Sequence, residues 1–134
     1  MSAKEVKDFD AVAIGRRVLS TEADALRTLA DSLGEAFTRA VEALFSAKGR
    51  IVCTGMGKSG HVARKIAATF ASTGAAAFFV HPAEASHGDL GMIGADDVIL
   101  GLSKSGEAPE LADVLAYATR FSIPLIALTA EPSS

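Results

Sequence analysis

Four short apolar runs in the second half of the chain constrain its fold more than any other feature. They show no alternation of polar and apolar residues, which indicates strands covered on both faces of a sheet. Helical patterns and short turns separate the runs, and this repetition predicts a parallel α/β sheet with right-handed crossovers. The predicted strands cover residues 51–54, Ala77–Val80, Val98–Leu102 and Leu125–Leu128.

Helical periodicity fills most of the chain between these strands. A helix over residues 59–73 is expected to bury one face, and Pro109 is acceptable at the start of a second helix over residues 109–121. A short helix is expected over Pro82–Ser86 in the long connection after the second strand. The residues of 59–73 that are predicted to face inward are Val62, Ile66, Ala67 and Phe70.

Two more helices are predicted ahead of the first strand, where apolar positions recur at helical spacing from about Ala11. Ser32 and Glu35 have the spacing of a capping box and indicate the break between them, and Gly49 is a credible stop for the second. We expect a helical N-terminal arm over about residues 11–48 and a parallel α/β part over about 49–134, together forming one domain. The first helix has no obvious place on the sheet, so another subunit is an alternative partner.

Composition excludes several classes of function. Of the 134 residues, 49% are hydrophobic and 22% charged, which is typical of a globular protein, and a net charge of −3 argues against nucleic acid as the main partner. No apolar run is long enough to span a membrane, and residues 1–8 lack the apolar core of a signal peptide. A single cysteine, Cys53, fits a reducing compartment. We therefore expect a cytoplasmic protein without membrane or nucleic-acid partners.

The segment Gly55-Met56-Gly57-Lys58-Ser59-Gly60-His61 joins the first predicted strand to a helix. Backbone N–H groups at a helix start favour an anion, and glycine lets a ligand approach the main chain. The literal Gly-x-Gly-x-x-Gly pattern also fits a dinucleotide site, but no acidic residue ends the next strand, and Glu84 lies too far into the loop. A nucleoside-triphosphate loop would require glycine at Val52. Both of those interpretations are disfavoured.

A second loop, Ser103-x-Ser105-Gly106-Glu107, also lies between a predicted strand and a helix. Loops that follow parallel strands emerge at the same edge of an open sheet, where ligands bind. Its two hydroxyls, together with Ser59 and free N–H groups, would form a neutral cradle for one phosphate, which suits a sugar phosphate better than a pyrophosphate. Turn and cap chemistry remains the alternative role of the two serines.

These two loops, together with His81-Pro82-x-Glu84-Ala85-x-His87-Gly88-Asp89-Leu90-Gly91-Met92, resemble the sugar isomerase (SIS) domain. More narrowly, the chain resembles bacterial D-arabinose 5-phosphate isomerases from about Ala11 to its end. The resemblance implies a three-layer, doubly wound, flavodoxin-like fold. It also implies isomerisation of D-arabinose 5-phosphate to D-ribulose 5-phosphate through an enediolate, for the Kdo sugar of lipopolysaccharide. The family works in the cytoplasm as homo-oligomers, with a tetramer most typical and a dimer the other expectation, and uses no organic cofactor.

By the same resemblance, Lys58 is catalytic, Glu110 has an acid–base role, and His87 approaches the substrate and takes part in binding an inhibitory zinc ion. The alternatives are a solvated charge for Lys58 and compensation of the helix dipole for Glu110. His61 and His81 are expected to make ordinary hydrogen bonds, Cys53 to fill the core, and no metal to be required. The expected substrate-binding residues are Gly55, Gly57, Ser59, Gly60, Ser103, Ser105, Gly106 and Glu107.

Two departures from the family pattern affect these expectations. Ala108 stands where related loops often carry Ser or Thr, so one phosphate hydroxyl is expected to be missing. The family's later part, with another catalytic glutamate and a histidine, is absent, so residues 1–134 alone are expected to bind sugar phosphate poorly and isomerise it little. A non-catalytic sugar-phosphate sensor and an isomerase of another phosphosugar remain alternatives.

Overall fold

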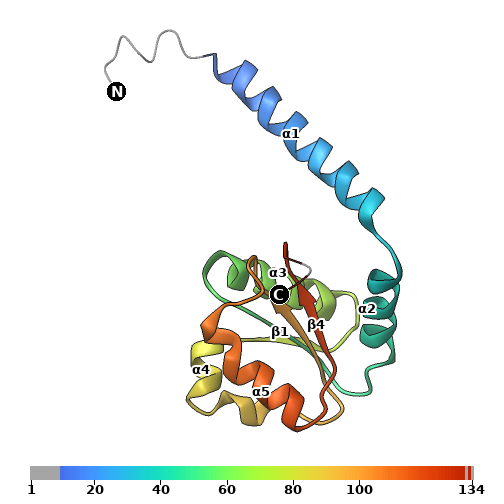
Figure 1. Ribbon diagram of the computed structural model, residues 1–134, viewed down its shortest axis with the longest axis vertical. Helices are drawn as coiled ribbons and strands as arrows, with labels where there is room; N and C mark the ends of the chain where they lie inside the picture. Colours follow the sequence, from blue (N-terminus) through green and yellow to red (C-terminus); the bar gives the residue numbers. More distant parts are fainter. Residues whose placement is uncertain (1–9, 132, 134) are drawn as a thin grey trace. The chain divides into compact units, whose positions relative to one another are not determined.

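The computed structural model describes residues 10–131 and Ser133, and it divides the chain after Thr38 into two compact units (Figure 1). The first unit contains helix α1 (Ala11–Ser32). Helix α2 (Glu35–Ser46) begins in the first unit and ends in the second, which contains all the strands. The division therefore falls within α2, ten residues before the expected start of the α/β part at residue 49.

Helix α1 begins at a capped end, where Asp10 Oδ1 accepts a hydrogen bond of 2.9 Å from the Ala13 N–H. None of its residues is buried within the described part of the chain. It ends at Ser32, where the break was predicted, but the capping box is wrong: the Ser32 hydroxyl donates to the Leu29 carbonyl at 2.7 Å. A serine in the last turn can bond back to its own helix, so α2 begins without it at Glu35.

The second unit contains a four-stranded parallel sheet in the order β2-β1-β3-β4. Its strands are β1 (Ile51–Gly55), β2 (Ala77–Val80), β3 (Val98–Leu102) and β4 (Leu125–Leu128). All four predicted strands are confirmed, and β1 is one residue longer than expected. The strand order reverses direction between β1 and β3, which in doubly wound sheets is the switch point where ligands bind.

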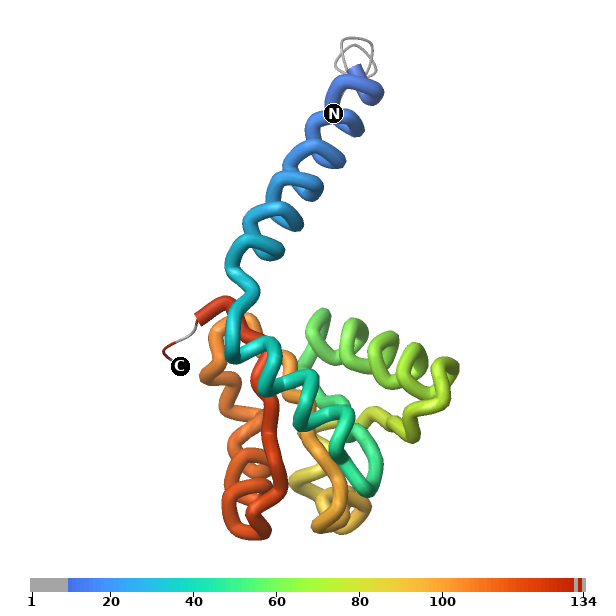
Figure 2. The backbone as a smooth tube through the Cα atoms, turned by 90° about the vertical axis from the view of Figure 1, so that its right-hand side faces the viewer, coloured from blue at the N-terminus to red at the C-terminus, as the bar shows by residue number. Residues whose placement is uncertain are grey.

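Helices cover both faces of this sheet, and the predicted three-layer α/β fold is confirmed. Helix α3 (Gly57–Ser72) lies on one face, and α4 (Pro82–Ser86), the 3-10 turn η1 (Asp89–Met92) and α5 (Ala112–Arg120) lie on the other (Figure 2). Each face has its own apolar cluster. Beneath α3 the buried residues are Ile51, Cys53, Ala63, Ala67, Val98, Leu100 and Leu102. Beneath α4 and α5 they include Val52, Val80, Ala85, Ile99, Val114 and Ala118.

The buried face of α3 differs from the predicted one by one residue. Val62 is 50% exposed, whereas Ala63 is fully buried. Small residues at Gly60, Ala63 and Ala67 form the buried stripe, which allows the helix to lie close to the strands. The other predicted helix is also modified, because Pro109 opens a 3-10 turn, η2 (Pro109–Leu111), before α5 begins.

An ion pair closes the amino edge of the sheet. Asp97 is only 4% exposed, and its carboxylate accepts hydrogen bonds from the backbone N–H groups of Arg50 at 2.7 Å and Gly94 at 2.8 Å. The Arg50 guanidinium donates to the same carboxylate at 3.1 Å and lies 4.5 Å from the centre of the Phe78 ring. Burial alone would raise the pKa of Asp97, but these hydrogen bonds and the Arg50 charge lower it below its ordinary value.

Candidate functional site

The two loops singled out in the sequence meet at the carboxyl edge of the sheet. Gly55, the last residue of β1, pairs directly with Leu102, the last residue of β3. The glycine loop (residues 55–60) and the serine loop (residues 103–107) therefore start side by side at the switch point. Their expected neighbourhood is confirmed, and both precede a helical segment whose N–H groups begin at this edge.

Close backbone contact explains two of the glycines in the first loop. A Cβ atom added to Gly60 would lie 2.5 Å from the Gly55 carbonyl oxygen, and one added to Gly55 would lie 2.9 Å from the Leu102 carbonyl oxygen. Gly57 instead has a φ of +53° with open space around it, a conformation that favours glycine. The loop thus brings the start of α3 tightly against β1 and β3 and leaves its first N–H groups at the edge.

The serine loop is shaped by its own side chains. Ser103 Oγ accepts a hydrogen bond of 3.1 Å from the Gly106 N–H, and Ser105 Oγ accepts one of 3.3 Å from the Glu107 N–H. Gly106 has a φ of +73°, which the turn requires. The turn chemistry that the sequence left as an alternative is therefore present. It uses each hydroxyl as an acceptor, so each O–H can still donate to an anion.

Two adjoining pockets open between these loops. The serine pocket has a volume of about 380 Å³ and the lysine pocket about 330 Å³, sizes suited to a small ligand. They share Ser59, Leu102, Ser103 and Lys104. The serine pocket is completed by Met56, Ser105, Ala108 and Glu131. The lysine pocket is completed by Lys58, Val62, Leu128, Thr129 and Ala130.

The predicted binding residues divide into three groups. Ser59, Ser103 and Ser105 line the serine pocket, and Lys58 lines the lysine pocket. Gly106 lines a third pocket of about 230 Å³ behind the serine loop. The glycines of the first loop line none of these three pockets. Two of them are buried by the strand–helix contact described above, so their role in the structure is to shape the loop.

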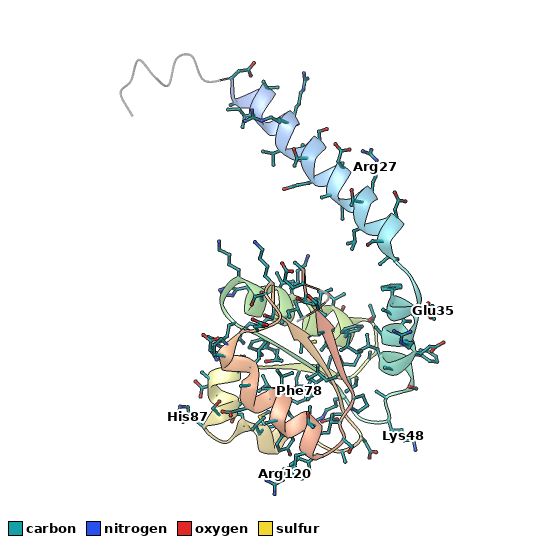
Figure 3. All side chains as sticks on the ribbon, viewed as in Figure 1. Arg27, Glu35, Lys48, Phe78, His87 and Arg120 are labelled. Atoms are coloured by element: carbon teal, nitrogen blue, oxygen red, sulfur yellow. The ribbon has the colours of Figure 1, made fainter. Side chains whose placement is uncertain are left out.

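Three other predicted residues line neither the serine pocket nor the lysine pocket. Glu107 and Glu110 are exposed in and after the serine loop, Glu110 within η2. His87 is exposed at the end of α4, where its side chain points outward (Figure 3). The structure brings Lys58 together with the serines, and it does not bring a glutamate or histidine of the predicted set beside Lys58. Their roles stay predictions that rest on the resemblance.

Four residues at this edge were missed by sequence reasoning. Lys104 and Met56 lie inside the two recognised motifs, and their position between loop residues was a usable signal. Glu131 lies just after β4, and only its place beyond the end of a parallel strand could have indicated it. Thr54 gave no signal. Its hydroxyl is buried and has no hydrogen-bond partner within the described part of the chain, and the residue lines the third pocket.

Three further expectations concern residues away from the pockets. Cys53 is fully buried, and burial raises the pKa of its thiol to about 11, so it is a core residue and no nucleophile at neutral pH. His81 caps α4, with Nδ1 accepting from the Ala83 N–H at 3.3 Å, as expected of an ordinary hydrogen-bonding role. Among residues 10–131 and Ser133 no cluster of metal-binding side chains occurs, and no helix has the length and apolarity to cross a membrane.

Known proteins similar to this chain include curated isomerases. Arabinose 5-phosphate isomerase KdsD of Pseudomonas aeruginosa is 50% identical over 128 residues, which are 96% of this chain and 39% of that protein. KdsD of Escherichia coli strain K12 is 48% identical over 126 residues, or 94% of this chain and 38% of that protein. The chain thus spans about two fifths of the length of these relatives.

Solved structures of known proteins share the fold of this chain. The structure described as E. coli CFT073 c3406 in complex with arabinose 5-phosphate is 38% identical, has a TM-score of 0.86, and matches 100% of this chain and 69% of its own. The sugar isomerase domain of an RpiR transcription factor from Sphaerobacter thermophilus is 25% identical, with a TM-score of 0.76 over 90% of this chain and 68% of its own. The family model of the SIS domain matches residues 43–134. The chain belongs to the SIS domain family.

Proposed function

We propose that this chain forms the sugar-phosphate-binding part of an aldose–ketose isomerase that interconverts D-arabinose 5-phosphate and D-ribulose 5-phosphate. The observation that carries the proposal is the likeness, over the whole chain, to a structure described as a complex with arabinose 5-phosphate. The isomerase names of relatives about half identical to this chain support the same substrate.

The serine pocket supplies the phosphate site in this proposal. Ser59, Ser103 and Ser105 each bring a hydroxyl from the two loops, and the first N–H groups of α3 add donors and the positive end of the helix dipole. Each hydroxyl of the serine loop can donate to a phosphate oxygen while its own oxygen still accepts the turn hydrogen bond. The sugar then extends from this anchor along the edge of the sheet towards Lys58.

The reaction itself moves one proton between two carbons. A base removes the proton from C2 of the aldose, the C–H electrons form the C1=C2 double bond, and O1 gains a proton, which gives an enediol. Return of a proton to C1 and loss of the O2 proton produce the ketose. The step requires a cation or donor near O1 and O2 to stabilise developing negative charge, and Lys58 is assigned to that role.

The acid–base roles are assigned by resemblance to the family. Glu110 would exchange the proton with the sugar carbons or oxygens, and His87 would contact the substrate. Both are exposed in this chain and line neither pocket, so their participation requires further contacts with the rest of the enzyme or with a second subunit. Glu107 would contact the substrate from the exposed end of the serine loop.

An oligomer in the cytoplasm is the second part of the proposal, in the Kdo and lipopolysaccharide pathway to which the isomerase activity would belong. Helix α1 supports a homodimer or homotetramer, because several of its large apolar side chains are about half to two thirds exposed within the described chain. They are Val12 63%, Val18 48%, Leu19 67%, Leu26 67% and Leu29 56%. Sedimentation of the purified protein at several concentrations tests this assembly.

A sugar-phosphate sensor without catalysis is the second candidate function. The sugar isomerase domain of the RpiR transcription factor supports it, because that domain has the same fold at 25% identity. A sensor needs the serine pocket and no base, and the two pockets formed here contain no glutamate or histidine of the predicted set. Turnover of the ligand therefore separates the two candidates.

The test follows purified chain with arabinose 5-phosphate in D₂O by NMR, in parallel with KdsD of Pseudomonas aeruginosa. Binding is measured from shifts of the serine-loop amides, and chemistry from deuterium entering the sugar and from ribulose 5-phosphate formation. We expect binding with turnover far slower than that of KdsD. Lys58→Met should abolish the exchange, while Lys48→Met, which changes a lysine near the other edge of the sheet, should not (Figure 3).

The outcomes distinguish the two candidates and test the assigned substrate. Binding of arabinose 5-phosphate without any deuterium exchange would favour the sensor and contradict the isomerase. Tighter binding of a six- or seven-carbon sugar phosphate would contradict the assignment of the substrate. The absence of any response of the serine-loop amides to sugar phosphates would contradict both candidates.

A further inference from the structure

Lys104 occupies a position that neither the motifs nor the proposed reaction uses. It lines both the serine pocket and the lysine pocket, whereas Lys58 lines only the second. Its side chain is exposed, and neither lysine forms an ion pair or side-chain hydrogen bond among the residues that the structure describes. Two lysines from two different loops thus line the lysine pocket, and neither is paired with a carboxylate among the described residues.

The backbone of Lys104 is fixed although its side chain is exposed. Its carbonyl oxygen accepts hydrogen bonds from the Ala130 N–H at 3.1 Å and from the Thr129 hydroxyl at 3.3 Å. On its other side, the Ser103 N–H donates to the Leu128 carbonyl at 3.1 Å. The segment after β4 therefore holds Lys104 at the carboxyl edge, one residue from each of the two loop serines.

The serines at this edge leave the negative charge of a phosphate without a cationic partner. A phosphate monoester carries between one and two negative charges near neutral pH, and serine hydroxyls are neutral donors. Lys58 is assigned to the reacting oxygens at C1 and C2, at the opposite end of the sugar from the phosphate. A second cation beside the serines would balance the negative charge of the phosphate.

We propose that Lys104 is that cation: its ammonium group binds the phosphate in the serine pocket and selects the dianionic form. The inference rests on the proposed function, in that it takes a sugar phosphate as the ligand of the serine pocket. It divides the work between two lysines. Lys104 sets the affinity for the phosphate, and Lys58 stabilises charge on the sugar oxygens at C1 and C2.

The test uses inorganic phosphate as the first probe, because it requires no catalysis. Its affinity for the wild-type chain, Lys104→Met, Lys104→Arg and Lys48→Met is measured by NMR titration between about pH 5.5 and 8.5, a range that spans the ionisation of the phosphate monoanion to the dianion. We expect wild-type affinity to rise as the dianion forms. Lys104→Met should weaken binding about tenfold and flatten the rise, because a charge-assisted hydrogen bond is lost. Lys104→Arg should restore most of the affinity, and Lys48→Met should match the wild type.

A monoanionic probe and turnover provide the second arm. Dimethyl phosphate, which cannot form a dianion, should lose less affinity on Lys104→Met than dianionic phosphate loses. With arabinose 5-phosphate, Lys104→Met should raise KM with kcat nearly unchanged, and Lys58→Met should lower kcat. Equal phosphate affinity in wild type and Lys104→Met would overturn the inference, as would a fall in kcat alone. Phosphate binding that depends on Lys104 in a chain without isomerase activity would uphold the inference while the proposed reaction fails.

Discussion

The two edges of the sheet differ in how completely their polar groups are paired. At the amino edge, three hydrogen bonds converge on the nearly buried Asp97 carboxylate from Arg50 and Gly94. At the carboxyl edge, Lys58 and Lys104 form no ion pair with other described residues, and the Thr54 hydroxyl has no described partner. The amino edge is satisfied by the chain itself, whereas the carboxyl edge retains donors and positive charge that a ligand can use.

Because of this difference, we expect folding stability to depend mainly on the amino edge and ligand binding mainly on the carboxyl edge. Changes at the amino edge should cost folding free energy and leave the pockets intact, because no residue of the Arg50–Asp97 ion pair lines either of them. Changes at the carboxyl edge should alter anion binding at smaller cost to folding.

The largest effect is expected for Asp97→Asn. The amide has nearly the same shape, but it loses the charge and presents N–H donors to the N–H donors of Arg50 and Gly94. The Asp97 carboxylate is nearly buried but the Arg50 side chain is 46% exposed, so we expect a loss of about 3 kcal/mol of unfolding free energy, the low end for a broken buried pair. Urea unfolding measures the loss, with Asp96→Asn as an exposed neighbouring control that should cost little. A phosphate affinity that falls in folded Asp97→Asn would contradict the separation of the edges.

The same carboxylate predicts how stability depends on pH. Because the pKa of Asp97 is lower in the folded chain than its ordinary value, the ion pair adds stability above that ordinary value. The contribution falls as the pH drops below about 4 towards the lowered pKa. Urea midpoints between about pH 6 and 3 should therefore fall less for Asp97→Asn than for the wild type. Parallel curves for the two proteins would show that the folded carboxylate titrates normally.

Gly60→Ala should have the next largest effect, because it damages the carboxyl edge itself. The added Cβ would lie 2.5 Å from the Gly55 carbonyl oxygen, so α3 must shift away from β1. We expect a loss of about 1–3 kcal/mol, the range for overpacking, together with weaker phosphate binding. Gly91→Ala is the control, since its Cβ would meet nothing within 4 Å. Equal stability of Gly60→Ala and Gly91→Ala would mean that α3 is not held by this contact.

The fold was largely predictable because its signals are local. Continuous apolar runs indicated the four strands, because a strand that is covered on both faces is apolar along its whole length. The proline at residue 82, whose φ is fixed, indicated the first residue of α4. The rotation of α3 was not predictable in this way. Val62 is the larger apolar residue, but close approach to the sheet favours the small side chain of Ala63, and that contact depends on residues distant in sequence.

The site was predictable to the level of its loops. Glycine and serine patterns identified Ser59, Ser103 and Ser105, because turns and helix starts have recognisable patterns in short stretches of sequence. Lys104 had a usable signal in its position between the two loop serines, whereas Glu131 required the structure, since it joins the site only where the segment after β4 reaches the serine loop. Whether Glu110 and His87 act with Lys58 stays a prediction, as neither lines the pockets that this chain forms.

Ser103→Ala should have a moderate effect on both properties. It removes one of the two acceptors of the Gly106 N–H, the other being the Ser103 carbonyl oxygen at 3.3 Å, which should cost up to about 1 kcal/mol of unfolding free energy, and it removes a hydroxyl from the serine pocket. Ser86→Ala is a matched control, because that hydroxyl also makes one hydrogen bond, to the Pro82 carbonyl, away from the pockets. Both variants should lose similar stability, but only Ser103→Ala should lose phosphate affinity, by about tenfold. Equal phosphate affinity in the two would leave Ser103 with a turn role alone.

The smallest effect, and one of opposite sign, is expected for Thr54→Val. The Thr54 hydroxyl is buried at the end of β1 without a described partner, and such a group costs free energy that a methyl group does not. Thr54→Val should therefore stabilise the chain by up to about 1 kcal/mol, whereas Thr54→Ser, which keeps the hydroxyl and loses a methyl group, should destabilise it. Urea unfolding with and without phosphate measures both. Destabilisation by Thr54→Val would mean that the hydroxyl is paired in solution. If that destabilisation were larger in the presence of phosphate, the third pocket behind the serine loop would be coupled to the phosphate site. Polar groups outside the serine and lysine pockets, the Thr54 hydroxyl among them, would then contribute to phosphate binding.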